Sequence, residues 1–387
     1  MTPLEFAKES ARYTIDLRQH FHENPELSQQ EFKTAERICH ELDKLNISYE
    51  KEVCGTGILA TIEGQPGDVV LGLRADIDAL PVTEASGVSF SSKNQGVMHA
   101  CGHDGHIAML LTAAKFLSEN RDTFKGTAKL IFQPDEELEG AAQKIVAERS
   151  DFFEDMTAIA GLHVWPDIPV GTISVDSGPR MAEADFFDIT IVGSSGHGSM
   201  PHQTIDPVLI SAHVITSLQS ICSRQVDPFL PTVVSVCAVN GGVAHNAIPD
   251  TVHLKGTCRY FSNDTRDTIK QRIETIVQGV TSSFGATYEI EYLYGAPFVE
   301  NDEHFSSLAQ QSVINTLGAS ALVSVAPSMA GEDFSEYLQK VPGCFGFIGI
   351  GKGEGQYPLH HSKFDMQEAG LINGVAFLVD YASSLLK

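Results

Sequence analysis

The segment HACGHDGHIAML, from His99 to Leu110, contains three histidines, one cysteine and one aspartate within its first eight residues, ahead of an apolar run. Imidazole and thiolate groups are typical ligands of zinc and of related transition metals. The same side chains are also compatible with a redox-active thiol, or with an ordinary loop that leads into a helix. The segment by itself leaves these three interpretations open.

Residues of similar chemistry follow apolar runs elsewhere in the sequence. Because the carboxyl ends of parallel strands meet at one edge of a sheet, where ligand sites collect, we expect these side chains to lie close together. A dispersed, carboxylate-rich set is typical of open catalytic metal sites, whereas structural zinc sites are usually local and rich in paired cysteines. The residues are Asp76 and Asp78 after LGLR, Glu136 and Glu137 after LIFQPD, His163 at the end of AIAGLH, and His360 and His361 after FGFIGIG.

Each of these residues also has a structural interpretation when it is taken alone. A single histidine at a strand end is more often a hydrogen-bonded loop residue than a ligand. Asp135 and Glu136 could simply favour the positive end of a following helix dipole. However, adjacent carboxylates such as Glu136 and Glu137 repel each other unless a cation lies between them. Neighbouring side chains of an extended segment point in different directions, so one can bind metal while the other faces a reacting water.

The elements that must hold these residues alternate between helices and strands. Short strands that are apolar throughout are typical of a parallel sheet that is buried on both faces. We therefore predict an α/β fold, with a mostly parallel sheet covered by helices. Helices are expected at 4–24, 29–45, 106–118 and 138–149, and strands at 57–63, 69–74, 129–133 and 158–164.

From residue 184 the pattern changes to strands in which polar and apolar residues alternate. The order β-α-β-β-α-β that follows is that of a ferredoxin-like α+β unit. We expect a discontinuous catalytic, metal-binding domain formed by residues 1–183 plus 299–387. Residues 184–298 are expected to form an inserted lid domain.

The composition argues against several kinds of partner. Lys and Arg number 26 against 50 Asp and Glu, which gives a net charge of −24. Such a chain repels polyanions, so neither nucleic acid nor an anionic membrane is an expected partner. The polar N-terminus lacks the apolar core of a signal peptide, and no apolar run is long enough to span a bilayer. Seven scattered cysteines without a CxxC pair indicate reduced thiols and a cytoplasmic location.

Several motifs occur in the order seen in the metal-dependent aminoacylase and carboxypeptidase superfamily. The chain most resembles the amidohydrolase branch, which includes hippurate hydrolases, auxin-conjugate hydrolases and N-acetyl-diaminopimelate deacetylases. The resemblance covers nearly the whole chain, and the motifs are jointly specific although each is weak alone. They are HFHENPELSQQEF, RADIDALP, HACGHDGH, FQPDEE, GLHVWPDIPVG, GHGSMPH, NAIPD, GTCRYF, GEDF and LHHSKFD.

The resemblance implies a binuclear centre that holds two divalent metal ions, which could be Mn, Zn, Co or Ni. Cys101 would bridge the two ions, and His361 is the alternative to His360. Glu136 would be the general base, and Asp78 would orient a metal ligand. Asp76 stands where more distant relatives carry a metal-binding histidine. The implied metal ligands are Cys101, His103, Glu137, His163 and His360.

The resemblance also assigns three residues of the inserted domain. His197 would polarise the scissile carbonyl and stabilise the oxyanion, and in related dimeric enzymes this histidine can come from the partner subunit. Asn246 and Arg259 would hold the substrate carboxylate, which arginine can bind through two parallel hydrogen bonds. A homodimer through the lid domain is expected by the same analogy. Among the other histidines, His22 is given a structural interpretation, whereas His106 could support the ligands.

The function implied by the resemblance is metal-dependent hydrolysis of the amide bond of N-acyl (N-acetyl or N-aroyl) L-amino acids. A dipeptidase or carboxypeptidase is the alternative within the superfamily, and Cys101 argues against it because this variant resembles the acyl-amino-acid branch. A metal-containing binding protein without turnover is the alternative from another class, and the retention of Glu136 argues against that. A thiol-redox protein built on Cys101 is a third hypothesis.

One segment departs from the pattern of the branch. The branch usually has alanine before the paired glutamates and glycines after them, whereas this chain reads PDEELEG. The departing residues are Asp135, Leu138 and Glu139. They leave the implied ligands in place. They are expected to change the shape of this loop, and with it the substrate preference.

Overall fold

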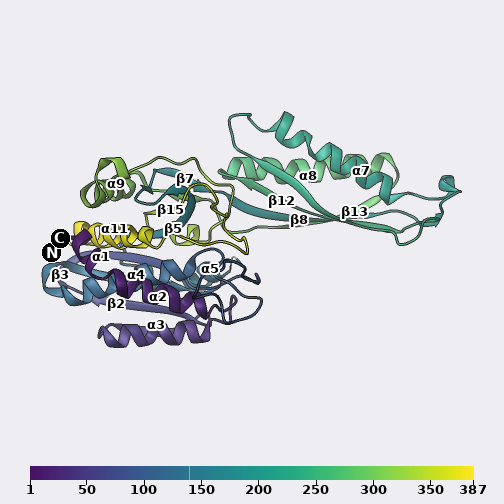
Figure 1. The fold of residues 1–387 in the computed structure, drawn as a ribbon. Coiled ribbons are helices and arrows are strands. Elements are labelled where there is room, and N and C mark those ends of the chain that lie inside the picture. Colours follow the sequence, from purple (N-terminus) through teal and green to yellow (C-terminus); the bar gives the residue numbers. More distant parts are fainter. Residues whose placement is uncertain (139) are drawn as a thin grey trace. The chain divides into compact units, whose positions relative to one another are not determined.

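The computed structural model describes residues 1–138 and 140–387, so the departure noted at Glu139 lies outside the described residues. The chain divides into two compact units, coloured along the sequence in Figure 1. The first, called here unit 1, comprises Met1–Arg180, Val299–Ala326 and Asp333–Lys387. The second, unit 2, comprises Met181–Phe298 and Pro327–Glu332.

The main sheet of unit 1 has seven strands in the order β1-β2-β4-β3-β5-β15-β6. The four strands from β4 to β15 are mutually parallel, whereas β1, β2 and β6 are antiparallel to their neighbours. The predicted α/β fold is therefore confirmed, with antiparallel strands at the two edges of the sheet. The strands are β1 (Ser48–Val53), β2 (Gly57–Glu63), β3 (Gln65–Asp76), β4 (Lys125–Gln133), β5 (Ala158–Pro169), β6 (Ile173–Ser174) and β15 (Gly343–Gly351).

Strand β1 was not expected from the sequence, because its residues SYEKEV are mostly polar and exposed at the sheet edge. Its connection to β2 explains why the pair is antiparallel. Only Cys54, Gly55 and Thr56 separate the two strands, and a connection this short permits only a hairpin. Cys54 and Gly55 both have positive φ angles, as tight hairpin turns require.

The helices of unit 1 cover the sheet, as Figure 1 shows for α2, α3 and α11. The predicted helix 4–24 is interrupted at Ser10, where no glycine or proline marks the break. Helices α2, α4 and α11 pack against one another, and α4 is buried along most of its length because it is apolar around its circumference. The helices are α1 (Pro3–Glu9), α2 (Ala11–Glu23), α3 (Phe32–Lys44), α4 (His103–Glu119), α5 (Ala141–Glu148), α6 (Ser150–Phe153), α9 (Glu303–Leu317), α10 (Ser335–Leu338) and α11 (Ala369–Leu385).

Helix α4 begins at His103, three residues earlier than its apolar pattern predicts. The residue before it, Gly102, has φ +87°, and a Cβ there would lie 2.4 Å from a methyl carbon of Val164. Only glycine combines this backbone conformation with this close approach. The glycine of HACGHD therefore allows the helix start to lie directly against β5.

Unit 2 is built on a four-stranded antiparallel sheet in the order β10-β12-β8-β13. Along the chain the order is β-α-β-β-α-β, as the sequence predicts for a ferredoxin-like unit. A separate two-stranded ribbon pairs β9 (Gly196–His197) with β11 (Ala247–Ile248). The other elements are β8 (Glu183–Val192), α7 (Pro207–Leu218), β10 (Val233–Asn240), β12 (Thr251–Tyr260), α8 (Asn263–Ser283) and β13 (Thr287–Leu293).

The remaining short strands, β7 (Gly178–Met181) and β14 (Val299–Asn301), pair with each other. The core of unit 2 follows the alternation of its strands, with Phe187, Ile189 and Ile191 of β8 pointing inward.

Among the described residues, no helix combines the length and the hydropathy needed to cross a bilayer.

Candidate metal centre

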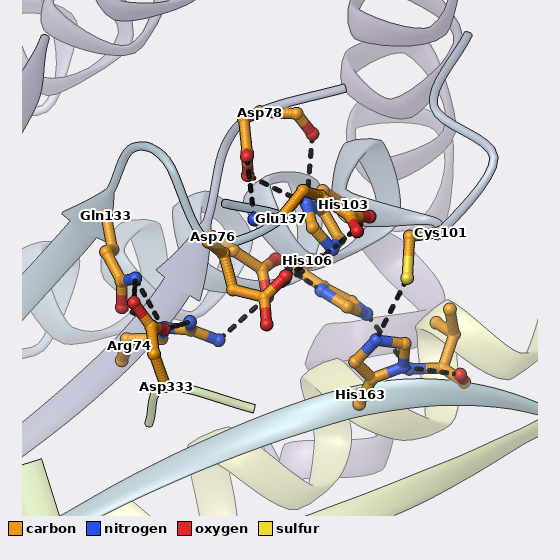
Figure 2. Close-up of polar contacts among 12 residues, drawn as sticks. Arg74, Asp76, Asp78, Cys101, His103, His106, Gln133, Glu137, His163 and Asp333 are labelled. Atoms are coloured by element: carbon orange, nitrogen blue, oxygen red, sulfur yellow. Dashed lines mark hydrogen bonds and ion pairs between the residues drawn. The ribbon is translucent and has the colours of Figure 1, made fainter. Parts of the chain in front are cut away.

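The carboxyl edge of the main sheet gathers the predicted ligands of unit 1, and Figure 2 shows Cys101, His103, Glu137 and His163 among them. The donor atoms of Cys101, His103 and His163 lie within 4.8 Å of one another. Of the other groups that meet the same criterion, two contain further predicted ligands and share a residue with the first. They are Cys101 with Glu137 and His360, and His103 with Glu136 and Glu137. The loop before α4, the loop after β4, strand β5 and the loop after β15 thus contribute to one cluster.

His103 is fully buried, and Asp78 fixes its orientation. The ring Nδ1 lies 2.9 Å from the carbonyl oxygen of Asp78 and 3.2 Å from its Oδ1. Because a carbonyl oxygen can only accept, Nδ1 carries a proton. The opposite atom, Nε2, has no hydrogen-bond partner within the described chain. Burial favours the neutral ring, but Asp76, Asp78 and Glu137 raise the pKa of His103 to about 10.

His163 is oriented by the same principle. Its Nδ1 donates to the carbonyl oxygen of Val164 at 2.7 Å, which leaves Nε2 directed toward Cys101 Sγ at 3.4 Å. Burial, reinforced by nearby His106, lowers the pKa of His163 well below its usual range. In both histidines, therefore, Nδ1 is held by a protein oxygen and Nε2 faces the cluster, as in histidines that bind metal.

Glu137 and His360 complete the cluster. The backbone N–H of Glu137 donates to Asp78 Oδ2 at 3.0 Å, and its Oε2 lies 3.4 Å from His360 Nε2. His361, the alternative ligand, instead stacks on Tyr357 and accepts a hydrogen bond from the backbone N–H of Lys363. The geometry therefore supports His360 over His361 as the ligand of this loop.

The donor set fits divalent cations of the zinc and manganese type. It combines sulfur, imidazole nitrogen and carboxylate oxygen. Cys101, His103 and His163 are buried, whereas the His360 side chain is 54% exposed. His103 Nε2 and Glu137 Oε1 are buried and lack hydrogen-bond partners among the described residues. Burial, together with Glu137 and Glu136, raises the pKa of the Cys101 thiol well above its usual range. A cation offsets this accumulation of negative charge and supplies the missing partners.

Glu136 lies beside the cluster and is almost fully buried. Its Oε2 is 3.9 Å from His103 Nε2, which is also 3.9 Å from Oε1 of Glu137. The two adjacent glutamates thus reach the same histidine from consecutive backbone positions. This arrangement permits one carboxylate to bind a cation while the other remains available for proton transfer.

Asp76 is held on both carboxylate oxygens (Figure 2). Arg74 Nη1 donates to Oδ2 at 2.7 Å, and His106 Nδ1 donates to Oδ1 at 2.5 Å. His106 Nε2 in turn accepts the backbone N–H of Val164 at 2.9 Å. Asp76 therefore connects the end of β3 to α4 and to β5 directly beside His163. His106 supports the ligands, as its place beside the motif allows.

A second group of buried polar residues lies behind Asp76 and was missed by sequence reasoning. Asp333, from the GEDF motif, accepts hydrogen bonds from Arg74 Nη2 and from Gln133 Nε2. Arg74 Nε also donates to Gln133 Oε1 at 2.8 Å. The available signal was an arginine and a glutamine at the ends of otherwise apolar strands, LGLR and KLIFQ, because buried polar side chains there need specific partners.

Arg18 and His22 form another buried group behind the start of α4. Arg18 Nε donates to Asp104 Oδ2 at 2.9 Å, and His22 Nδ1 lies 2.8 Å from the same oxygen. Arg18 also contacts Glu368 at 3.0 Å, just before α11. His22 Nε2 lies 3.2 Å from Glu84 Oε1. His22 has the structural role expected for it, and the group fixes the residue that follows His103.

The predicted site residues of unit 2 are more exposed than the buried ligands of unit 1. His197 is exposed, and its Nδ1 accepts the backbone N–H of Ser199 at 3.1 Å. Asn246 is also exposed and directly precedes β11, the neighbouring strand of the ribbon, and its carbonyl oxygen accepts the N–H of Gly198. Arg259 is half-buried, and its guanidinium lies over the ring of Phe186.

The structure brings together His197 and Asn246 but not Arg259. The ribbon that carries His197 continues from the end of β12 at Thr251, because Gly193 N donates to Asp250 O. Arg259 lies near the opposite end of β12. At about 3.3 Å per residue, Thr251 and Arg259 are roughly 26 Å apart along the strand.

Comparisons with known proteins agree on one family. Peptidase family M20/M25/M40 matches residues 72–384. The chain is 38% identical over 372 residues to N-acetyl-L-cysteine deacetylase from Bacillus subtilis, with 96% of this chain and 88% of that protein covered. It is 44% identical over 291 residues to N-acyl-L-amino acid amidohydrolase from Geobacillus stearothermophilus, with 75% and 78% covered. A dinuclear metal-binding peptidase of the M20 family from Bacillus subtilis has a similar solved structure, with TM-score 0.86, 35% identity and coverage of 98% and 99%.

Proposed function

The chain belongs to peptidase family M20/M25/M40, and we propose that it is a metal-dependent amidohydrolase of N-acyl L-amino acids. It would release a carboxylate and a free amino acid. The observation that carries the proposal is the buried cluster of Cys101, His103 and Glu137 with Glu136 at its side. The relatives named N-acetyl-L-cysteine deacetylase and N-acyl-L-amino acid amidohydrolase support this substrate class.

The cofactor would be a pair of divalent cations of the Mn, Zn, Co or Ni type. When bound, these cations would polarise the substrate carbonyl and make water nucleophilic at neutral pH. Cys101 would bridge them, because it belongs to a donor group with His163 and to another with His360. The proposed ligands are Cys101, His103, Glu137, His163 and His360.

Glu136 would act as the general base. Its carboxylate would take the proton of the attacking water and later pass it to the leaving amine nitrogen. Asp78 would keep His103 and Glu137 in fixed positions during this proton transfer. It holds the His103 ring through one oxygen and the Glu137 backbone through the other. This division of roles is consistent with the burial of all four residues.

His197 would stabilise the oxyanion. Its Nδ1 accepts a backbone N–H, so in the neutral ring the proton lies on Nε2. Nε2–H can therefore donate to a developing negative charge on the substrate oxygen. Asn246 and Arg259 would bind the substrate carboxylate, although Asn246 precedes the start of β12 and Arg259 lies near the far end of that strand.

The expected homodimer offers a reason for this separation. Two copies that associate through unit 2 would allow one copy to supply His197 and Asn246 while the other supplies Arg259. The sheet of unit 2 ends at β10, an edge strand that can pair with another chain. Large apolar side chains are exposed on and near this strand, namely Phe229, Val239 and Val243.

The thiol-redox hypothesis receives little support. All seven cysteines are free, so Cys101 has no partner for a disulfide in the described structure. Reactive thiols have a lowered pKa, whereas burial and nearby carboxylates raise the pKa of Cys101. Free cysteines also favour a reducing, cytoplasmic location.

A substrate panel tests the proposal. The protein is loaded with Mn, Co, Ni or Zn and incubated with N-acetyl and N-benzoyl amino acids, including N-acetylcysteine, and with dipeptides; the released amine is measured. We expect cleavage of the N-acyl substrates. Cleavage of dipeptides alone would favour the peptidase alternative, and a complete lack of turnover would favour a metal-containing binding protein.

A matched pair of variants tests the roles of the two glutamates. Glu136→Gln should lower kcat by about 10²–10⁴-fold without loss of metal, because general-base catalysis contributes this much. Glu137→Gln should instead lower the metal content measured by elemental analysis. If Glu136→Gln turns over substrate at the normal rate, the proposed base is wrong.

A further inference from the structure

Two non-glycine residues with left-handed backbone conformations contact each other beside the proposed base. Gln29 has φ 64° and Asp135 has φ 55°. Gln29 Nε2 donates to Asp135 Oδ2 at 2.8 Å. This conformation is disfavoured for residues that have a Cβ, and it persists only where the surroundings enforce it. Asp135 directly precedes Glu136, so its backbone angles help to set where the Glu136 side chain points.

Glu31 supplies the enforcing contact. Its side chain is fully buried, and its Oε1 accepts the backbone N–H of Asp135 at 3.0 Å. Its Oε2 accepts the hydroxyl of Thr56 at 2.7 Å. Within the described chain Glu31 forms no ion pair with Lys, Arg or His. A buried carboxylate without a cation is costly to maintain, so its hydrogen bond to Asp135 calls for an explanation.

The other side of Glu136 is held from the same segment. Ser28 donates to Asp78 Oδ2 at 2.7 Å, and the same oxygen accepts the backbone N–H of Glu137 at 3.0 Å. Residues 28–31 therefore fix the backbone both before and after Glu136. The contacts join residues that are about a hundred positions apart in the sequence.

We infer that Glu31, assisted by Gln29, is a positioning residue for Glu136. Glu31 holds Asp135 in its left-handed conformation, and this directs the Glu136 carboxylate toward the cluster. The inference rests on the proposed function, because it assumes that Glu136 is the base. It also gives a role to Asp135, the residue that departs from the alanine usual in this branch.

The test compares substitutions of Glu31 and Gln29, together called the brace, in the metal-loaded protein. Glu31→Ala removes the acceptor, and we expect kcat to fall by about 10²-fold, the cost of misplacing a reacting group by about 1 Å, with KM nearly unchanged. Glu31→Gln should retain most of kcat, because its amide oxygen can accept from Asp135 N while its NH₂ donates to the Thr56 hydroxyl. Gln29→Ala, at an exposed position, should lower kcat less than Glu31→Ala does.

Glu52→Ala is the matched control for Gln29→Ala. Glu52 also has a positive φ, 63°, but its side chain is 77% exposed and lies on β1. It should therefore show any general cost of alanine in this conformation, with normal kcat. If Glu31→Ala does not fold, Glu31→Asp takes its place: the carboxylate is retained but its reach toward the Asp135 N–H is one methylene shorter, so kcat should likewise fall.

Two readouts that do not use turnover separate the inference from the proposed function. Metal content should be unchanged in every brace variant, and hydrogen exchange of the Asp135 amide should become faster in Glu31→Ala than in the parent. A parent that cleaves no substrate would overturn the proposed function, and the inference with it, even if the brace protects this amide. Loss of metal in proportion to kcat, or a kcat in both Glu31→Ala and Gln29→Ala equal to that of Glu52→Ala, would overturn the inference alone.

Discussion

His103 in unit 1 and His197 in unit 2 are both assigned to the same reaction, yet their surroundings differ completely. His103 is fully buried, and Asp78 holds its Nδ1 from two atoms. His197 is exposed, and Ser199 of its own loop contacts its ring Nδ1. The difference agrees with what each is proposed to bind. A cation requires donors at fixed distances, whereas a substrate that enters and leaves requires access.

Two sets of charged residues, one in each unit, differ in burial in the same way. In unit 1, Arg18, Asp104 and Asp76 are buried and connect several elements through charged hydrogen bonds. In unit 2, the ion pair between Lys255 and Asp188 lies on the surface. We therefore expect substitutions of the buried residues that hold the metal centre of unit 1 in place, such as Arg18 and Asp78, to alter stability or metal affinity. Substitutions at the candidate residues of unit 2 should alter turnover alone.

The largest expected effect concerns Arg18. Arg18→Met leaves Asp104 buried without its arginine partner, and breaking a buried pair typically costs about 3–5 kcal/mol of the free energy of unfolding. Denaturant unfolding of the metal-loaded protein measures this loss. Arg12→Met on the same helix is the control, because its pair with Asp16 is exposed and should contribute at most about 1 kcal/mol. Equal losses of the free energy of unfolding in the two variants would contradict the proposed difference between buried and exposed ion pairs.

His197→Ala should lower kcat by about 10²–10³-fold, the effect typical of removing one oxyanion donor. Metal content and thermal stability should stay normal, since the side chain is exposed. Steady-state kinetics and elemental analysis provide the measurements. His202→Ala, at a nearby exposed position, should have normal kinetics. A loss of metal in His197→Ala would show that unit 2 is not separable from the metal centre in this way.

Asp78→Asn should weaken metal binding by about 10–100-fold, as is typical for residues that orient metal ligands. The amide has one accepting oxygen, so it cannot serve both the His103 ring and the Glu137 backbone as the carboxylate does. Titration calorimetry with Zn or Mn measures the change. Asp188→Asn in unit 2 should leave the affinity unaltered. An unchanged affinity in Asp78→Asn would remove this residue from the metal centre.

The smallest expected effect is a pH dependence of stability from His22. Burial opposes the charged ring, but Asp104 and Glu84 raise the pKa of His22 from 6.5 to about 9. Because the pKa is higher in the folded state, this stabilisation is fully present below pH 6.5 and is lost as the pH rises through about 9. The difference in the free energy of unfolding between the parent and His22→Gln should therefore shrink over that interval. A constant difference would refute the charged interaction.

The sequence by itself determined the chemistry and the class of fold. Apolar strands alternating with helices predicted the α/β fold, because periodicity is a local property of the chain. The motifs around Cys101, Glu136 and His163 identified the family, and the residue types in them identified metal-binding chemistry. Strand β1 was missed because its polar residues lie on a sheet edge and carry no apolar pattern.

The tertiary structure alone decided how these residues are held. The choice between His360 and His361 depends on which ring reaches Glu137, and the tautomer of His103 depends on a carbonyl of Asp78. The buried partners of Arg18 and Glu31 come from residues far away in the sequence. Such pairs follow from the register of the sheet and the packing of helices on it, and no local pattern in the sequence encodes them.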